Sequence, residues 1–332
     1  MTENRNISSL SGISNDLSDT SNGVTLNAFA KINLTLDVLG IRSDGFHEVE
    51  MIMQQISLCD TVTVDWQPME DAEGVYINLN TDRSDIPSGP GNLAFKAALL
   101  MADMFGKKQR GQISIDIKKS IPAAAGLAGG SSDCAAVIHA LNVIWELGLP
   151  LSELCRAGAK LGSDVPFCIM GQAAANDLLK PAFSDDPLSC HCALAYGRGT
   201  ELKPIRPGLR SYIALSKPGI SVSTAEVYAG IDSEPVMIHP DNSKMMQALS
   251  ENNNKVVREN MINVLENFTL KHYPVIVYTK NKMSDLCNSG SALMSGSGPT
   301  VFCLCESQAE AQHICCEMLK ANEESFAVET TR

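Results

Sequence analysis

A run of small residues between Pro122 and Asp133 has the composition of a loop that binds phosphate. Its glycines let the backbone bend sharply and leave N–H groups free, and such groups bind anions. The run stands before a stretch of helical spacing, and the start of a helix adds N–H donors and the positive end of its dipole. The hydroxyls of Ser131 and Ser132 could contact phosphate or Mg²⁺. These residues together predict a site for the phosphates of a nucleotide.

Two familiar phosphate motifs are absent from this run. No Gly-Lys-Ser/Thr follows the glycines, and the pattern Gly-x-Gly-x-x-Gly does not occur there. The alternative is a tight connection from strand to helix, in which a serine or an aspartate caps the helix. Three further segments favour the phosphate site over that alternative.

Each of these segments has chemical character and also a plain structural alternative. Lys31 lies among apolar strand residues, where a charge is costly unless an anion meets it, although it could also protect a sheet edge. Asp164 stands just before Pro166 and could be a helix cap. The segment 294–302 contains a second loop of glycine and serine and could be a simple hairpin. Their occurrence together in one chain favours a common site.

The first half of the chain alternates strand and helix patterns that would position these residues. The two-residue period of a strand occurs at residues 24–38, 49–55, 60–66 and 112–117. Apolar residues at helical spacing occur at residues 92–105, 132–147 and 151–161. Strands mixed with helices in this way predict an α+β domain.

The second half has a similar but shorter pattern after a loop-like stretch at residues 172–196. We expect strands at 211–216 and 301–305, helices from about residues 224 and 241 and at 306–322, and either a strand or a helix at 274–280. The sequence therefore predicts a disordered tail at 1–23, a first domain at 24–174 and a second domain at 175–326.

Composition and charge limit the classes of function. With 332 residues, 44% of them hydrophobic and 19% charged, the chain is long enough for one large or two ordinary domains. A net charge of −12 argues against binding to nucleic acid or to an anionic membrane, but not against a nucleotide held by local N–H groups. No apolar stretch is long enough to span a membrane, and residues 1–23 resemble neither a signal nor a transit peptide.

The cysteines are numerous but poorly spaced for a metal site. The chain has 11 of them, and Cys190-His191-Cys192 is the one cluster with ligand character, without a second pair at zinc spacing. Reduced, buried thiols of a cytoplasmic protein are the favoured interpretation.

The combination of these motifs resembles the galactokinase, homoserine kinase, mevalonate kinase and phosphomevalonate kinase family. The resemblance spans about residues 25–325 and rests on Ala30-Lys31-Ile32-Asn33-Leu34, Arg42-Ser43-Asp44-Gly45-Phe46-His47, the run 122–133, Gly162–Phe167, Lys217-Pro218-Gly219 with Ser223-Thr224, and the loop 295–302. It implies a two-domain kinase of small molecules. The first domain would resemble the ribosomal protein S5 domain 2-like fold and the second a ferredoxin-like fold, with the active site between them.

The resemblance also implies the cofactors and the roles of the residues. ATP and Mg²⁺ are the expected cofactors, a small alcohol is the expected partner, and the oligomeric state is left open. Asp164 would accept the proton of the substrate hydroxyl, or orient that hydroxyl, and Lys31 would lie beside it. The ATP phosphates would lie along Pro122, Ala123, Ala124, Ala125, Gly126, Leu127, Ala128, Gly129, Gly130, Ser131 and Ser132. The choice of serine for the metal stays open, and Asp133 is expected to be a charge at the helix start.

Within this family the chain resembles the branch whose alcohol substrate carries a cytidine diphosphate. Phe46 and His47 would read the cytosine by stacking and hydrogen bonds, with Tyr228 on the other face of the base. Asn33 and Thr224 would contact the diphosphate or sugar part of the substrate. This branch phosphorylates the 2-hydroxyl in non-mevalonate isoprenoid synthesis.

One departure and three alternatives accompany this resemblance. Residues 174–193 look like an insertion into the family's pattern, tolerated as a surface loop that would bring Cys190-His191-Cys192 to the edge of the cleft.

The alternatives are a sibling kinase acting on homoserine, mevalonate or a sugar, a nucleotide-sensing relative without chemistry, and a scaffold whose glycine loops are only turns.

Overall fold

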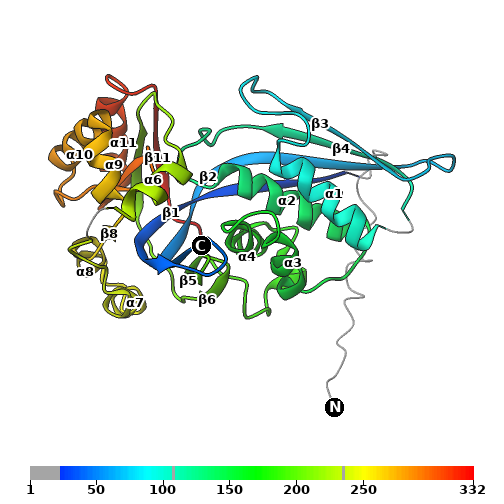
Figure 1. Cartoon of the computed structure of the whole chain (residues 1–332), viewed down its shortest axis with the longest axis horizontal. Coiled ribbons are helices and arrows are strands. Elements are labelled where there is room, and N and C mark those ends of the chain that lie inside the picture. Colours follow the sequence, from blue (N-terminus) through cyan, green and yellow to red (C-terminus); the bar gives the residue numbers. More distant parts are fainter. Residues whose placement is uncertain (1–22, 107–108, 234–235) are drawn as a thin grey trace, which may run out of the picture.

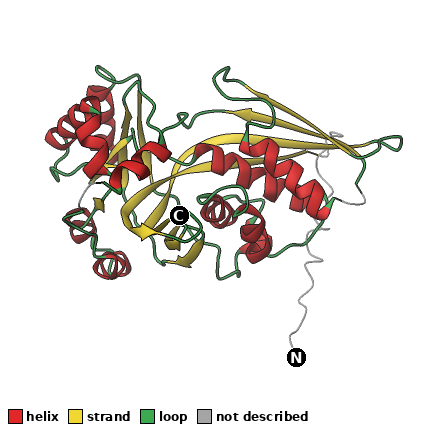
Figure 2. Ribbon diagram, viewed as in Figure 1, coloured by secondary structure: helices red, strands yellow, loops and turns green. Residues whose placement is uncertain are grey.

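The computed structural model describes residues 23–106, 109–233 and 236–332. Two β-sheets, each with helices packed against it, make up the molecule (Figures 1 and 2). The predicted disordered tail lies outside the described residues except for Gly23, which begins the first strand. No helix in the described ranges is both long and apolar enough to cross a membrane.

The first sheet has seven strands and is built around a long antiparallel hairpin. Its strands are β1 (Gly23–Ile41), β2 (His47–Pro68), β3 (Val75–Thr81), β4 (Gly111–Lys118), β5 (Cys192–Gly197), β6 (Glu201–Pro204) and β8 (Ile262–Asn263). Across the sheet the strands lie in the order β3-β4-β2-β1-β8. The C-terminal half of β2 pairs with β4, whereas its N-terminal half pairs with β5, and β6 pairs with β5.

The helices of the first half pack on this sheet and on one another. They are α1 (Leu93–Phe105), α2 (Gly129–Ile144), α3 (Leu151–Gly158), α4 (Val165–Ala175) and the single turn α5 (Lys180–Phe183). The central helix α2 contacts β1 and β2, and α1 and α4 contact α2 (Figure 1). Because α2 is surrounded in this way, its residues from Ser132 to Asn142 are all buried.

The second sheet has the ferredoxin-like topology that the resemblance implies. Its strands are β7 (Tyr212–Lys217), β9 (Leu293–Met294), β10 (Val301–Cys305) and β11 (Glu324–Glu329), in the order β11-β7-β10-β9. The helices of this half are α6 (Thr224–Ile231), α7 (Asn242–Ser250), α8 (Asn254–Glu259), α9 (Glu266–His272), α10 (Pro274–Leu286) and α11 (Gln308–Met318). Helices α10 and α11 pack on the sheet, which has the β-α-β-β-α-β arrangement typical of this fold.

The pairing of β1 with β2 is irregular where β1 passes the glycine-rich run. The register shifts between Phe29 and Lys31, where β2 has two more residues than β1. Ala28 before the shift belongs to the core beneath the helices, whereas Ile32 after it packs with residues of the second sheet. Just beyond the shift, the Lys31 side chain faces the glycine-rich run and donates to the Gly126 carbonyl.

Several boundaries differ from those predicted. The expected strands at 49–55 and 60–66 are one strand, β2, and residues 274–280 lie in helix α10. The division at 174/175 stays a prediction; of the strands after it, β5 pairs with β2 of the first sheet, and β6 pairs with β5. The suspected insertion contains α5, whose Phe183 packs into the core under the helices. A buried aromatic side chain anchors this segment to the first domain.

A fully buried histidine on α2 predicts a loss of stability in acid. Burial lowers the pKa of His139 to about 4, and its Nε2 lies 2.9 Å from the Ile169 carbonyl oxygen. The unfolded chain binds this proton near pH 6.5, so stability present above that pH falls as the pH drops towards 4, by up to about 3 kcal/mol. Urea unfolding at pH 7 and pH 5 should show this slope.

The His139→Asn variant should show a smaller slope, whereas His313→Asn, at an exposed position, should retain it. Some slope will remain in the first variant, because burial also lowers the pKa of His191 to about 4. An unchanged slope in His139→Asn would contradict the assignment.

Candidate active site

One large cavity brings together most of the predicted site residues. It has a volume of about 1140 Å³ and is lined from both halves of the chain. The predicted residues that line it are Lys31, Asn33, Phe46, His47, Pro122, Ala123, Ala124, Ala125, Gly126, Ala128, Gly129, Gly130, Ser131, Asp164, Thr224 and Tyr228. Leu127 and Ser132 are buried away from it, and the Leu127 carbonyl accepts a hydrogen bond from the backbone N–H of Lys31.

The glycine-rich run begins helix α2 without a side-chain cap. Ala128 is the N-cap residue, with φ 60° in the left-handed region, and no side chain accepts from the first turn. The sequence alternative of a serine or aspartate cap is therefore wrong. Because the first N–H groups of a helix have no partner within it, those of α2 at residues 129–131 are free to bind an anion in the cavity.

Only one of the two serines can contact a ligand in the cavity. Ser131 is partly exposed and lines it. Ser132 is fully buried, and its hydroxyl donates to the carbonyl of Phe29, so it holds α2 against β1. The expectation that both serines contact the phosphate is thus corrected by the helical turn, which places adjacent residues on different faces.

The loop 295–298 packs directly against the glycine-rich run. The Ser295 hydroxyl donates to the carbonyl of Gly126 at 2.9 Å, and a Cβ at Gly126 would lie 2.2 Å from the Ser295 carbonyl oxygen. The buried amide of Asn263 donates to the carbonyls of Met294 and Gly296 and so fixes the second loop. Asn263 has no signal in the sequence, because its partners lie some 30 residues away with no local pattern to connect them.

Gly126→Ala should weaken ATP binding. Gly126 has φ +73°, and the added methyl group would meet backbone, which cannot move as a flexible side chain can. Strain of about 1–3 kcal/mol is the usual cost of such a conformation. We expect the Kd for ATP to rise about tenfold in a titration. Gly74→Ala, with nothing within 4 Å of the new Cβ, is the matched control. Equal affinities in the two variants would contradict the packing argument.

Lys31 and Asp164 meet in the cavity. The Nζ atom of Lys31 lies 3.8 Å from Oδ2 of Asp164 and donates to Oδ1 of Asn33 at 2.7 Å and to the carbonyl of Gly126 at 3.2 Å. The Lys31 side chain is 5% exposed and that of Asp164 is 30% exposed. Asp164 is the N-cap residue of α4, yet its side chain makes no cap hydrogen bond. The carboxylate is therefore available to a substrate.

The residues expected to read a base gather at the hairpin between β1 and β2. His47 lies against Tyr228, with ring centroids 4.9 Å apart, and its Nε2 is 2.9 Å from Oδ1 of Asp232. The Arg198 guanidinium lies 4.0 Å from the centroid of the Phe46 ring. Burial, with a smaller contribution from the charge of Asp164, raises the pKa of the Tyr228 phenol, which is therefore neutral. Asp232 and Arg198 also line the cavity and were not selected from the sequence.

The remaining predicted contacts have local partners. Asn33 accepts from Lys31, as described, and its amide contacts the sulfur of Met51 at 3.2 Å. The Thr224 hydroxyl lies 2.9 Å from that of Ser297 and so links α6 to the second glycine loop. Whether Asn33 and Thr224 contact the substrate stays a prediction, as does the placement of Phe46 and Tyr228 on two faces of a base.

A buried ion pair supports the glycine-rich run from beneath. The Lys119 ammonium contacts Asp60 and lies 2.7 Å from Oδ2 of Asp133. Burial raises the pKa of Asp133, while Asp133 and Asp60 together raise the pKa of Lys119 against the opposing effect of its own burial. Asp60 also accepts the backbone N–H groups of Ser120 and Ile121. Asp133 is thus part of a structural network, more specific than the helix-start charge expected.

The Cys190-His191-Cys192 cluster has no ligand geometry. Cys190 and Cys192 are buried thiols, as the favoured interpretation predicts. The His191 Nδ1 atom lies 3.0 Å from Oε1 of Gln55 and 2.9 Å from the Thr331 hydroxyl, and these residues do not line the cavity.

The fold and the cavity define a kinase of small molecules, and comparison with known proteins gives the same class. The model of the GHMP kinase N-terminal domain matches residues 92–172, and that of the C-terminal domain matches residues 238–324. The chain belongs to the GHMP kinase family.

Within this family the chain groups with the 4-diphosphocytidyl-2-C-methyl-D-erythritol kinases. A relative of that name from Geobacillus kaustophilus (strain HTA426) is 41% identical over 291 residues, which cover 88% of this chain and 91% of the relative. A crystal structure of 4-(cytidine 5'-diphospho)-2C-methyl-D-erythritol kinase matches with a TM-score of 0.71 and 27% identity, over 93% of this chain and 100% of the other. Homoserine kinase from Cytophaga hutchinsonii ATCC 33406 shares the fold, with a TM-score of 0.65 and 19% identity, over 96% and 97% of the two chains.

Proposed function

We propose that this chain transfers the γ-phosphate of ATP to the 2-hydroxyl of 4-diphosphocytidyl-2-C-methyl-D-erythritol. The products are ADP and the 2-phosphate, a step of non-mevalonate isoprenoid precursor synthesis. The observation that carries the proposal is a single cavity that contains the Lys31–Asp164 pair, the free N–H groups of α2 and the His47–Tyr228 pair. The names of the relatives support the same substrate. We propose the cytoplasm as its location, since 11 cysteines suit a reducing compartment.

Asp164 and Lys31 act on the hydroxyl that is phosphorylated. In phosphoryl transfer the protein mainly positions groups and stabilises charge. The Asp164 carboxylate accepts the proton of the substrate hydroxyl and aims its oxygen at phosphorus. Lys31, 3.8 Å away, favours the ionised carboxylate and offsets negative charge on the transferring group. Asn33 and the Gly126 carbonyl hold the ammonium in place.

The start of α2 holds the phosphates of ATP. The N–H groups at residues 129–131 donate to phosphate oxygens, and the helix dipole favours their charge. The oxygen donors beside them, the hydroxyl of Ser131 and the carboxylate of Asp164, suit Mg²⁺, which prefers oxygen ligands and phosphate. Ser131 is the serine that would hold it. Mg²⁺, when bound, neutralises charge on the phosphates.

His47 reads the cytosine. Its contact with Asp232 holds the ring in one orientation, and Tyr228 packs beside it. An imidazole fixed in this way presents its other nitrogen for a hydrogen bond with the base. Phe46, half exposed beneath Arg198, offers an aromatic face for stacking. Homoserine and mevalonate contain no base, so a kinase of either would not need this group of residues.

His47→Ala should raise the KM for the cytidine substrate about tenfold or more, because a lost hydrogen bond and lost ring packing cost roughly 1–3 kcal/mol. The KM for ATP should hardly change, since the start of α2 is intact. His313→Ala, at an exposed position, is the control. Equal rises in both KM values would contradict the separate roles.

The direct test is ATP-dependent phosphorylation of 4-diphosphocytidyl-2-C-methyl-D-erythritol, followed by ³¹P NMR of the product, with homoserine and mevalonate as competing alcohols. Turnover of the cytidine compound alone is expected. Turnover of another alcohol instead would favour a sibling kinase. ATP binding without any turnover would favour a nucleotide sensor, and no ATP binding would favour a scaffold.

A further inference from the structure

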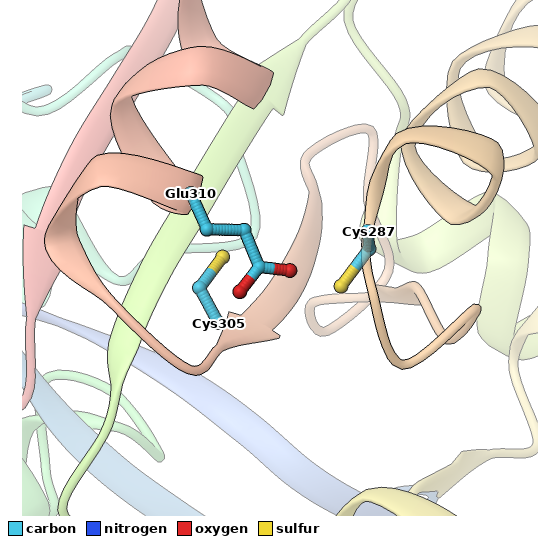
Figure 3. Close-up of side chains that lie close together, drawn as sticks. All are labelled: Cys287, Cys305 and Glu310. Atoms are coloured by element: carbon cyan, nitrogen blue, oxygen red, sulfur yellow. The ribbon is translucent and has the colours of Figure 1, made fainter.

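Two cysteines and a glutamate converge at one end of the second sheet, far along the chain from the catalytic residues. Cys287 follows the end of α10, Cys305 ends β10, and Glu310 lies in the first turn of α11. One ligand atom from each of the three lies within 4.8 Å of those of the other two. Figure 3 shows the three side chains pointing toward a common centre. None of these residues lines the active-site cavity.

The two thiols are shielded from solvent and lie close to other polar atoms. Cys287 and Cys305 are 5% and 3% exposed. The Cys287 sulfur lies 3.2 Å from the Ser289 hydroxyl and 3.8 Å from the Leu304 carbonyl. A cation between the two sulfurs would remove the repulsion between two neighbouring thiolates.

The Glu310 carboxylate is held by two backbone hydrogen bonds, only one of which belongs to the cap of its own helix. One carboxylate oxygen accepts the backbone N–H of Glu306 at 2.7 Å, as a cap does. The other accepts the N–H of Asn288 at 2.8 Å, in the loop directly after Cys287. Each oxygen keeps a further lone pair for a metal. The two hydrogen bonds therefore fix the carboxylate beside the thiols without using up its capacity as a ligand.

We propose that Cys287, Cys305 and Glu310 bind one Zn²⁺ ion. Thiolate sulfur and carboxylate oxygen bind zinc at about 2.3 Å and 2.0–2.2 Å, and two sulfurs on a tetrahedral ion lie about 3.8 Å apart. The present separation, within 4.8 Å, allows this with small side-chain rotations. Each thiol gives up its proton on binding, and water takes the fourth position.

The position of the ion gives it a structural role. Glu310 is partly exposed, so an ion can reach the site from solvent past its carboxylate. The ligands come from the ends of three separate elements. The ion would join α10, β10 and α11 and stabilise the second domain without contact with the reacting groups.

The test is a titration of the full chain, reduced, stripped of metal and kept free of oxygen, with Co²⁺ as the probe. We expect one equivalent to produce thiolate-to-cobalt charge transfer and the visible bands of a tetrahedral site, both removed by one equivalent of Zn²⁺. Cys287→Ser and Cys305→Ser should each lower the affinity at least 100-fold, and Glu310→Gln at least tenfold. Cys315→Ser removes a buried thiol of α11 outside the cluster and should bind as the parent chain does.

A second measurement guards against variants that fail to fold. In the unmodified chain, Zn²⁺ should protect Cys287 and Cys305 from alkylation, as counted by mass spectrometry of peptides, and should raise the Tm. Absence of both stoichiometric binding and protection would overturn the proposal. So would equal loss of binding in Cys315→Ser, or recovery of a Cys287–Cys305 disulfide in place of a metal complex.

Discussion

Asp164→Asn is expected to lower kcat about 10³-fold while the protein still binds ATP. General base catalysis contributes typically 10²–10⁴-fold, and an amide can neither accept the hydroxyl proton nor balance the charge of Lys31. The carboxylate makes no cap hydrogen bond and is 30% exposed, so the change should cost little stability. Single-turnover kinetics with 4-diphosphocytidyl-2-C-methyl-D-erythritol would measure the chemical step, and an ATP titration would measure binding.

The matched control is Asp103→Asn, which makes the same change on the exposed side of α1. It should retain full activity. If Asp164→Asn kept more than about a tenth of the parent rate, the carboxylate would be an orienting group and not the base. If both substrates bound poorly as well, the variant would have disturbed the start of α4, and the rate would say nothing about proton transfer.

Lys119→Met should destabilise the chain by about 3–5 kcal/mol, because removing one member of a buried ion pair leaves uncompensated charge. Asp60 is fully buried and the Lys119 side chain is 3% exposed, so solvent cannot replace the ammonium. Lys118→Met makes the same replacement one residue earlier, where the side chain is exposed, and should cost little. Urea unfolding of the two variants beside the parent chain measures the difference.

The loss of stability in Lys119→Met should itself depend on pH, and its sign follows from the pKa of Asp133. Burial already raises the pKa of Asp133 above its ordinary value, and loss of Lys119 raises it further. A raised carboxyl pKa means that the native state prefers the protonated form. Stability is therefore greatest below the unfolded pKa and is lost as the pH rises through the folded value. The deficit of Lys119→Met should shrink from pH 8 towards pH 5. A deficit independent of pH would indicate lost packing and not lost charge.

The active-site chemistry was largely predictable from the sequence. The glycine-rich run predicted a phosphate site, because it is a local pattern with a direct chemical meaning, and the order of Lys31, that run, Asp164 and the loop 295–302 resembled a known family, which implied a nucleotide-dependent kinase. The positions of most strands and helices followed from apolar periodicity in the same way. Residues 49–55 and 60–66 were predicted as two strands but belong to the single strand β2, because the long hairpin continues through the break in their alternation.

The partners that hold these residues were decided by tertiary structure. Asn263 fixes the second glycine loop, Asp232 orients His47, and Asp60 meets Lys119 across 59 positions of sequence. Nothing in the spacing of a single chain connects such pairs, because their proximity results from sheet order and packing. The three ligands proposed for zinc belong to the same class, since they come together only where α10, β10 and α11 end or begin.

The direction of each functional side chain was likewise beyond the sequence. Alternation along residues 24–38 predicts one continuous strand, but it does not predict the irregular pairing with β2 after Phe29 or the approach of Lys31 to Asp164. The same limit applies to Ser131 and Ser132, adjacent in sequence but divided between the cavity and the core by one helical step. The sequence determined which groups are candidates for the chemistry. The folded chain decided which of them face the cavity, because strand pairing and helical phase set a side chain's direction without changing its local pattern.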